Sequence, residues 1–365
     1  MKDLRLYQIA LKHLEGIGSL RAKKLVAYTG GLEELFNASK KELAKTPEIG
    51  MALINKLDRP QALKKAEKEL KFIDRNHLEA FFYLDHTYPY RLMHCGDSPV
   101  ILYGKGVFNL NPSKSVAIVG TRDCSDYGLK ITERLVEALA PYKPLIVSGL
   151  AYGIDTCAHR SAVQYGLQTV GVLGNSLDRV YPAVNRSLAD KMMQNGGLLS
   201  EFDSGTKPDR ENFPQRNRVV AGMADVTIVV ESGVKGGSLI TARLAAGYNR
   251  DVMAIPGPID SPVSSGCNYL IKTNQAALIE SVDDIAYNMG WDREEEQRST
   301  QKQLFVDLNE EERVIVNALE EKQKDSVDNL SLACGWPISK TSTMLLELEF
   351  KGMVRSLPGK IYALA

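Results

Sequence analysis

Residues suited to binding an anion gather in short segments between residues 120 and 241. Each segment follows a run of β-branched or apolar residues and contains small residues, which leave backbone N–H groups open to a ligand. The segment 207–218 adds the densest positive charge, and arginine binds phosphate through two parallel N–H donors. From this pattern we expect a phosphate-binding surface made of Arg122, Ser125, Ser148, Gly149, Lys207, Arg210, Phe213, Arg216, Asn217, Arg218, Gly236, Gly237, Ser238 and Thr241.

Three residues of the 207–218 segment leave alternatives open. If Phe213 is exposed, it can stack on a nucleic-acid base, a contact worth about 1–3 kcal/mol; if it is buried, it fastens the start of the following helix. Arg216 and Arg218 stand two residues apart, so on a helix they point about 200° from each other. We therefore expect one of them to face a ligand and the other to bridge within the fold, to Glu201 or Glu231.

Several enzyme and cofactor signatures are missing from the sequence. There is no G-x-x-x-x-G-K-[ST] segment for nucleotide hydrolysis, and the first glycine turn is not G-x-G-x-x-G. The strand predicted at residues 145–148 ends at Ser148 and Gly149, without the acidic residue that binds a ribose hydroxyl. The five histidines and five cysteines show no metal-ligand spacing. We predict no cofactor, no metal and no enzymatic activity, and we expect His159 to be a packed helix residue.

The elements that must position these residues form an alternating pattern. Short β-branched or apolar runs alternate with helical patterns between residues 115 and 257, which predicts a doubly wound, mainly parallel α/β sheet of Rossmann-like type, covered on both faces. Ligands of such sheets bind beyond the carboxyl ends of the strands. The predicted strands are residues 115–119, 145–148, 169–173, 198–200, 226–231 and 252–255, with two more at 81–84 and 100–103.

Two further domains flank the predicted sheet domain, residues 81–290. Residues 1–80 show short helices of helix-hairpin-helix or SAM-like type, in which the Gly16-Ile17-Gly18 turn either approaches a DNA phosphate or only reverses the chain. Residues 291–304 are polar and predict a linker. Residues 305–365 predict three helices and a hairpin, the pattern of a winged helix.

Charge is distributed unevenly although the formal net charge is zero. Residues 1–80 contain 16 Lys and Arg against 11 Asp and Glu, residues 113–285 contain 17 against 18, and residues 305–365 contain 7 against 10. A DNA site in the central domain must therefore be a local cluster, and the winged helix is expected to contact protein or to bind DNA weakly. No apolar run approaches the roughly 20 residues of a membrane helix, and no secretory signal is evident, so we expect a cytoplasmic protein.

The glycine-rich segments together resemble the DprA/Smf family. The resemblance covers about residues 81–285 and rests on the segments VAIVGTR (116–122), SGLAYGID (148–155), LDRVYP (177–182), FPQRNR (213–218), GSLITA (237–242), IPG (255–257) and GCNYLI (266–271). It implies a single-stranded-DNA-binding protein that helps to load RecA recombinase onto DNA, as in natural transformation and competence, and that forms a homodimer. By motif match it implies phosphate contact through Arg122, DNA contact through Arg210 and Phe213, and dimerisation near Leu270 and Ile271.

The sequence departs from the family pattern at Gly236, where many members have Ser, and at residues 245–248, which are less charged than usual. A second hypothesis also remains at this point. The central domain resembles the lysine-decarboxylase-like nucleotide phosphoribohydrolases, in which Glu201 or Glu231 would act on a glycosidic bond.

Overall fold

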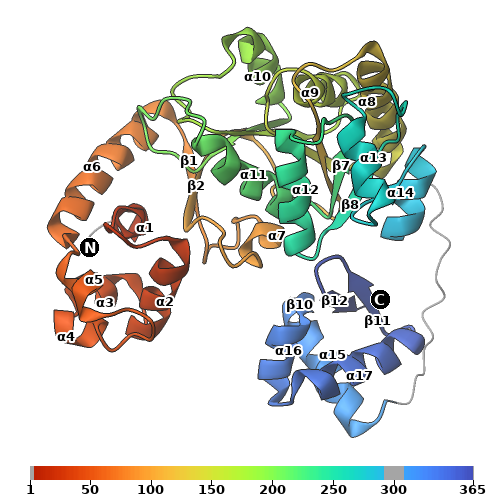
Figure 1. Ribbon diagram of the computed structural model, residues 1–365. Coiled ribbons are helices and arrows are strands. Elements are labelled where there is room, and N and C mark those ends of the chain that lie inside the picture. Colours follow the sequence, from red (N-terminus) through yellow and green to blue (C-terminus); the bar gives the residue numbers. More distant parts are fainter. Residues whose placement is uncertain (1–3, 292–307, 365) are drawn as a thin grey trace.

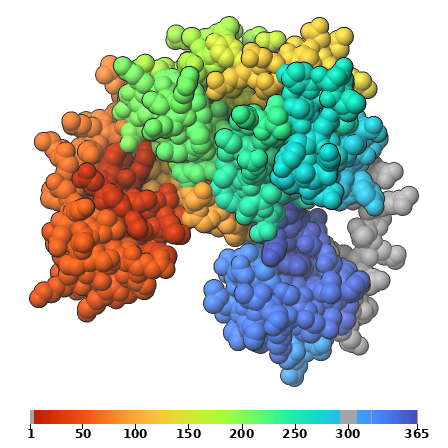
Figure 2. Space-filling model, viewed as in Figure 1, coloured from red at the N-terminus to blue at the C-terminus, as the bar shows by residue number. Residues whose placement is uncertain are grey.

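The computed structural model describes residues 4–291 and 308–364 (Figure 1). Three parts are visible: a helical part at the N-terminus, a central α/β domain and a C-terminal winged helix. On the face shown in Figure 2, an open gap separates the helical part from the winged helix, and each contacts the α/β domain. The predicted linker, residues 291–304, lies outside the described residues except for Trp291.

The helical part begins and ends its helices at the breaks that the sequence indicates. Gly30 ends one helix with φ 81°, a left-handed conformation that favours glycine. Ser39 begins another as the N-cap of a capping box with Glu42. The helices are α1 (Leu4–Lys12), α2 (Ser19–Thr29), α3 (Leu32–Asn37), α4 (Lys40–Leu43), α5 (Met51–Asn55) and α6 (Arg59–Asn76).

The central domain contains a nine-stranded sheet in the order β1-β2-β6-β5-β4-β3-β7-β8-β9. β2 is antiparallel to both of its neighbours, and the remaining pairs are parallel. The strands are β1 (Glu79–Phe82), β2 (Ile101–Val107), β3 (Ser115–Val119), β4 (Leu145–Ser148), β5 (Thr169–Leu173), β6 (Gly196–Ser200), β7 (Val226–Val229), β8 (Asp251–Ala254) and β9 (Ala277–Leu278). The predicted fold class, a doubly wound and mainly parallel sheet, is confirmed.

Every residue of β3, β4, β5 and β7 is buried, because helices cover both faces of the sheet. Val116 and Ile118 belong to one core cluster, together with residues of α8, α9 and α14. Ala117 and Val119 belong to a second cluster, which includes residues of α11, α12 and α13 and continues into the helical part. The helices are α7 (Tyr90–Met93), α8 (Asp126–Leu139), α9 (Ile154–Gln164), α10 (Arg186–Met192), α11 (Asn212–Met223), α12 (Gly237–Gly247), α13 (Ser265–Lys272) and α14 (Val282–Met289).

β3 pairs with β4 on one side and with β7 on the other. The chain leaves β3 toward one edge of the sheet and later returns to build the other, so the loops after β3 and β7 separate at this point. A crevice at the carboxyl ends of the strands is expected where the strand order reverses in this way.

The winged helix has its own core, formed among others by Ile315, Leu330 and Leu345. Its three-stranded sheet has the order β10-β12-β11. It contacts the α/β domain where the Arg250 Nη1 donates a hydrogen bond to the Pro358 carbonyl at 3.0 Å. Its elements are α15 (Glu310–Lys322), β10 (Lys324–Ser326), α16 (Val327–Cys334), α17 (Ile338–Phe350), β11 (Val354–Leu357) and β12 (Ile361–Leu364). No helix in the described ranges is long and apolar enough to cross a membrane.

Candidate phosphate-binding site at the sheet edge

A cavity of about 340 Å³ opens at the point where the strand order reverses. Its walls come from the carboxyl end of β3, the loop after β4, and the N-terminal parts of α11 and α12. The predicted residues that line it are Arg122, Gly149, Phe213, Arg216, Asn217, Gly236, Gly237, Ser238 and Thr241. The structure therefore brings together residues from segments that are more than a hundred positions apart in the sequence.

One wall of the cavity is the N-terminus of α12. Gly236 is the N-cap residue, and no side chain caps this helix end. A Cβ atom on Gly236 would lie 2.2 Å from the Ser232 Oγ, whereas one on Gly237 would meet open space. The Ser238 hydroxyl donates to the Ser232 Oγ at 2.7 Å, inside the fold. The first backbone N–H groups of α12 are thus left to bind an anion, with the positive end of the helix dipole behind them.

Phe213 lies close to two guanidinium groups in the lining of the cavity. The Cζ atom of Arg122 is 5.1 Å from the centre of the Phe213 ring, and that of Arg216 is 6.0 Å from it. The Tyr181 ring is 6.3 Å away at an interplanar angle of 31°. Phe213 is half-buried, and its ring also packs over Gly174, where a Cβ atom would approach it to 2.9 Å. The ring is therefore an aromatic surface with two guanidinium groups within 6.0 Å of its centre.

Arg216 carries a buried positive charge beneath the cavity. Its Nη1 lies 3.9 Å from the Asp155 Oδ2 and donates to the Val172 carbonyl at 3.3 Å. The same Asp155 oxygen accepts from the backbone N–H groups of Gly149 at 3.1 Å and Ala151 at 3.3 Å. Burial lowers the pKa of the Arg216 guanidinium and raises the pKa of the Asp155 carboxyl. A Cβ atom on Gly149 would lie 1.2 Å from Nη1, so glycine makes room for this group.

Arg218 does not line the cavity, which corrects its assignment to the site. It forms an ion pair with Glu201 and donates to the Asp97 carbonyl, on the side of α11 that faces the helical part. The prediction that the two arginines separate, with one bridging to Glu201, is confirmed. Arg216 faces the cavity and Arg218 is the bridging residue.

Two of the predicted serine contacts, Ser125 and Ser148, do not line the cavity, and both hydroxyls are used within the fold. Ser125 donates to Glu231 through its backbone N–H at 2.9 Å and through its hydroxyl, and it caps α8. The Ser148 hydroxyl is buried and donates to the Ile118 carbonyl at 2.6 Å. The bonds to Glu231 and to the Ile118 carbonyl follow from tertiary contacts, for which the sequence gives no direct signal. The cap is local, and a serine before a helical pattern is a sequence signal for it.

Lys207 and Arg210 are exposed on the loop between β6 and α11, outside the cavity lining. Leu270, predicted at a dimer contact, is 1% exposed and packs in the chain's own core, so its side chain is not available at the surface; Ile271 is half-buried. His159 is fully buried with its Nδ1 2.7 Å from the Thr169 hydroxyl, as a packed residue should be.

Asp155, Tyr152 and Tyr181 belong to the site although they were not among the predicted contact residues. Asp155 is 6% exposed and lines the main cavity, while the two tyrosines line an adjoining hollow of about 20 Å³. A signal for the tyrosines exists in the sequence, since both stand in glycine-rich or proline-containing segments that follow predicted strands. Asp155 could have been found as a carboxylate next to free loop amides.

The two glutamates of the hydrolase hypothesis do not line the cavity. Glu201 is paired with Arg218, and Glu231 accepts from Ser125. Burial raises the pKa of the Glu201 carboxyl. Neither carboxylate is free beside the cavity to act on a glycosidic bond, so no observation favours this hypothesis.

Comparison with known proteins gives concordant results across the chain. The family described as DNA recombination-mediator protein A matches residues 79–290, and the DprA winged helix domain matches residues 300–360. The chain is 42% identical to DNA processing protein DprA of Streptococcus pneumoniae over 206 residues, which cover 56% of this chain and 72% of the relative. It is 30% identical to Protein Smf of a Synechocystis species over 98% of each chain.

Two solved structures are similar to this one. The X-ray structure of DNA processing protein A from Streptococcus pneumoniae has a TM-score of 0.65 and 34% identity, and the match covers 77% of this chain and 97% of that one. DNA processing protein A from Helicobacter pylori has a TM-score of 0.53 and 31% identity, with 58% and 94% covered. The Helicobacter pylori protein is described as having a unique single-stranded DNA binding mode.

Proposed function

The chain belongs to the DNA recombination-mediator protein A family, and on that premise we propose that it binds single-stranded DNA at the cavity over the carboxyl ends of β3, β4 and β7. The Helicobacter pylori relative, 31% identical, is described by its single-stranded DNA binding mode. The proposed role is binding and handing over a strand, without a chemical step on it.

The observation that carries this proposal is the proximity of Phe213 to both Arg122 and Arg216. A single strand alternates flat bases with phosphates, so its site needs an aromatic face and cations at short intervals. Phe213 offers the face, Arg122 is an exposed cation beside it, and the N-terminus of α12 adds backbone donors for a phosphate. Because stacking on an aromatic ring and contacts to phosphate do not read base edges, we expect little sequence preference.

Within this proposal, the bound strand is passed to RecA recombinase, and two copies of the chain act together. The support for the first point is the family description as a recombination mediator. The second point is tested by sedimentation of the purified protein. A monomer at micromolar concentration would contradict it.

Fluorescence anisotropy with labelled oligo-dT tests the binding site. Arg122→Ala should weaken binding without a change in sequence preference, because the lost contact is to phosphate. Arg134→Ala removes an equally exposed arginine from α8, outside the cavity, and is the matched control. Equal affinities for the two variants would contradict the assignment.

A further inference from the structure

Helix α6 carries a straight row of four basic residues: Lys64, Lys68, Lys71 and Arg75. Their spacing of four, three and four residues places them within about 60° of one another around a helix of 100° per residue. All four are exposed, and none has an ion pair or hydrogen bond with a described residue. Along the axis the row extends about 16 Å at 1.5 Å per residue.

The row points directly away from the packed side of α6. The buried residues of this helix are Ala62, Ala66, Glu69 and Ile73, which lie on the opposite face. Two acidic residues, Glu67 and Asp74, flank the row on one side, and Asp74 is already paired with Arg5 at 2.9 Å. The outer face of α6 therefore carries a net positive charge, within a helical part that is basic although the whole chain is neutral.

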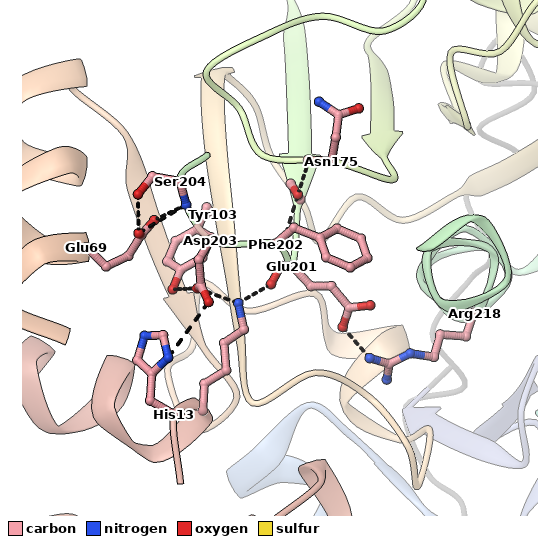
Figure 3. A network of polar contacts seen from close by, with 11 residues as sticks. His13, Glu69, Tyr103, Asn175, Glu201, Phe202, Asp203, Ser204 and Arg218 are labelled. Atoms are coloured by element: carbon pink, nitrogen blue, oxygen red, sulfur yellow. Dashed lines mark hydrogen bonds and ion pairs between the residues drawn. The ribbon is translucent and has the colours of Figure 1, made fainter. Parts of the chain in front are cut away.

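The opposite side of α6 contacts the loop that leads into the cavity. Glu69 accepts from the Ser204 backbone N–H at 3.0 Å and from its hydroxyl at 2.6 Å (Figure 3). The neighbouring Asp203 is bound by Lys12 at 2.5 Å and by the Tyr103 hydroxyl at 3.1 Å. These contacts fix the helical part to the segment between β6 and α11.

From that contact the chain reaches the cavity in a few residues. Lys207 follows Ser204 by three residues, so their Cα atoms are at most about 11 Å apart. Lys207 and Arg210 are both exposed, and Phe213 comes three residues after Arg210. Two exposed cations, Lys207 and Arg210, therefore lie between the cavity mouth and the contact with α6, on a loop that also exposes Asp209 and Glu211.

We propose that the basic row of α6 binds the sugar-phosphate backbone of the single strand held in the cavity, at nucleotides beyond those that the cavity holds. The inference rests on the proposed function, which it extends to a second contact on another domain. Repeated exposed cations match a polyanion, and the strand would release counterions as it binds. An acidic protein partner fits less well, because protein interfaces bury an apolar centre and α6 has no exposed large apolar residue.

The test compares oligo-dT of about six nucleotides with oligo-dT of about thirty nucleotides. The short one is near the lower end of the site sizes of about 4–16 nucleotides known for single folds, and the long one exceeds them. The row variant is Lys64→Gln, Lys68→Gln, Lys71→Gln and Arg75→Gln. The matched control is Lys40→Gln, Lys41→Gln, Lys45→Gln and Lys56→Gln, which removes the same charge from exposed positions of the same domain. Glutamine keeps a helix propensity close to that of lysine.

The row variant should bind the long oligonucleotide at least about tenfold more weakly in low salt, with its salt slope reduced by about 0.7 for each lost contact. Its affinity for the short oligonucleotide should not change, and the control variant should bind both as the unmodified protein does. Unchanged affinity of the row variant for the long oligonucleotide would overturn the proposal, as would an equal loss in the control variant or an equal loss on the short oligonucleotide.

Two further results distinguish strand binding by the row from self-association and from a failure of the cavity site. If the row variant loses self-association in sedimentation but keeps its affinity for the long strand, then the row binds an acidic protein surface and the proposal is wrong. If the unmodified protein binds neither oligonucleotide, the proposed function itself fails. Binding of the short oligonucleotide without any row effect on the long one would remove only the second contact.

Discussion

The carboxyl edge of the sheet and the exposed face of the winged helix differ in the side chains that they offer to a ligand. At the sheet edge, Arg122 and Arg216 both lie close to the Phe213 ring, near a helix end that no side chain caps. On α17 of the winged helix, Leu346 is 51% exposed and Phe350 is 84% exposed. The nearest cation on α17, Lys340, is paired with Glu311 and lies over Trp336.

Winged-helix domains are associated with DNA binding, in which the second helix of the helix-turn-helix contacts the bases. Rossmann-like sheets are associated with nucleotides. In this protein the charges favour DNA binding at the Rossmann-like sheet over DNA binding at the winged helix. Binding to a phosphate backbone requires cations, and residues 305–365 contain 7 of them against 10 acidic residues. Function must therefore be assigned from the residues of a site and not from the fold that carries it.

The largest expected effect is the loss of stability on removal of Arg216 from the sheet edge, compared with removal of Lys340 from the winged helix. Arg216→Ala leaves Asp155 buried without its cation, which should lower the free energy of unfolding by about 3–5 kcal/mol. Lys340→Ala in the winged helix breaks an exposed pair, and a change below about 1 kcal/mol is expected there. Urea unfolding followed by circular dichroism measures both. Similar losses for the two variants would show that the Arg216 pair is not a supporting element of the site.

Phe213→Ala should weaken single-stranded DNA binding by about 1–3 kcal/mol, the range for one stacked base. Phe350→Ala removes a more exposed phenylalanine from the winged helix and should leave oligo-dT affinity unchanged. Anisotropy titrations of both variants against the same oligonucleotide decide between the regions. A larger loss from Phe350→Ala would move the binding surface to the winged helix.

Acidification should lower the free energy of unfolding of the α/β domain because His159 is buried there. Residues 305–365, which include the winged helix, contain no histidine, so no such loss is expected from a histidine there. Burial lowers the pKa of His159 to about 3 from its ordinary value of 6.5. Between these values only the unfolded chain binds the proton, so stability falls as the pH drops below about 6.5, by about 2 kcal/mol at pH 5.

His159→Asn should be less stable than the unmodified protein at pH 7 but should lose less stability between pH 7 and pH 5. Unfolding curves at the two pH values measure this difference. An identical loss in both proteins would show that another group controls the acid response.

Removal of residues 299–365 should have the smallest effect on DNA binding, a change in oligo-dT affinity within a few-fold. The described contacts of the winged helix with the α/β domain involve Arg250 and Tyr90, which do not line the cavity. Anisotropy with the truncated chain measures the change. A large loss would mean that the winged helix contributes directly to strand binding despite its acidic charge.

Local sequence patterns predicted most of the fold. The runs at 115–119, 145–148 and 169–173 coincide with β3, β4 and β5, because β-branched residues bounded by turn residues give a clear signal. β9 has two residues and β10 three, too short to show any periodicity, and both were missed. β6 begins two residues before its predicted start, at glycines that propensity disfavours but that pack closely against β2 and β5.

For the candidate site, the sequence was informative where helix geometry alone determines the direction of a side chain. The 200° separation of Arg216 and Arg218 was enough to predict their different roles. The partners of Ser125 and Ser148 within the fold, Glu231 and the Ile118 carbonyl, could not be predicted, because they lie in or after other strands of the sheet. Such contacts depend on register and layer packing, which a single sequence does not specify.

The most direct test of the central claim is a salt titration of oligo-dT binding to the unmodified protein and to Arg122→Ala. If the sheet edge holds the phosphates, the unmodified protein should show a steep fall in affinity with salt, and Arg122→Ala should reduce the slope by about 0.7. An unchanged slope and affinity in Arg122→Ala would contradict the assignment of the strand to this edge.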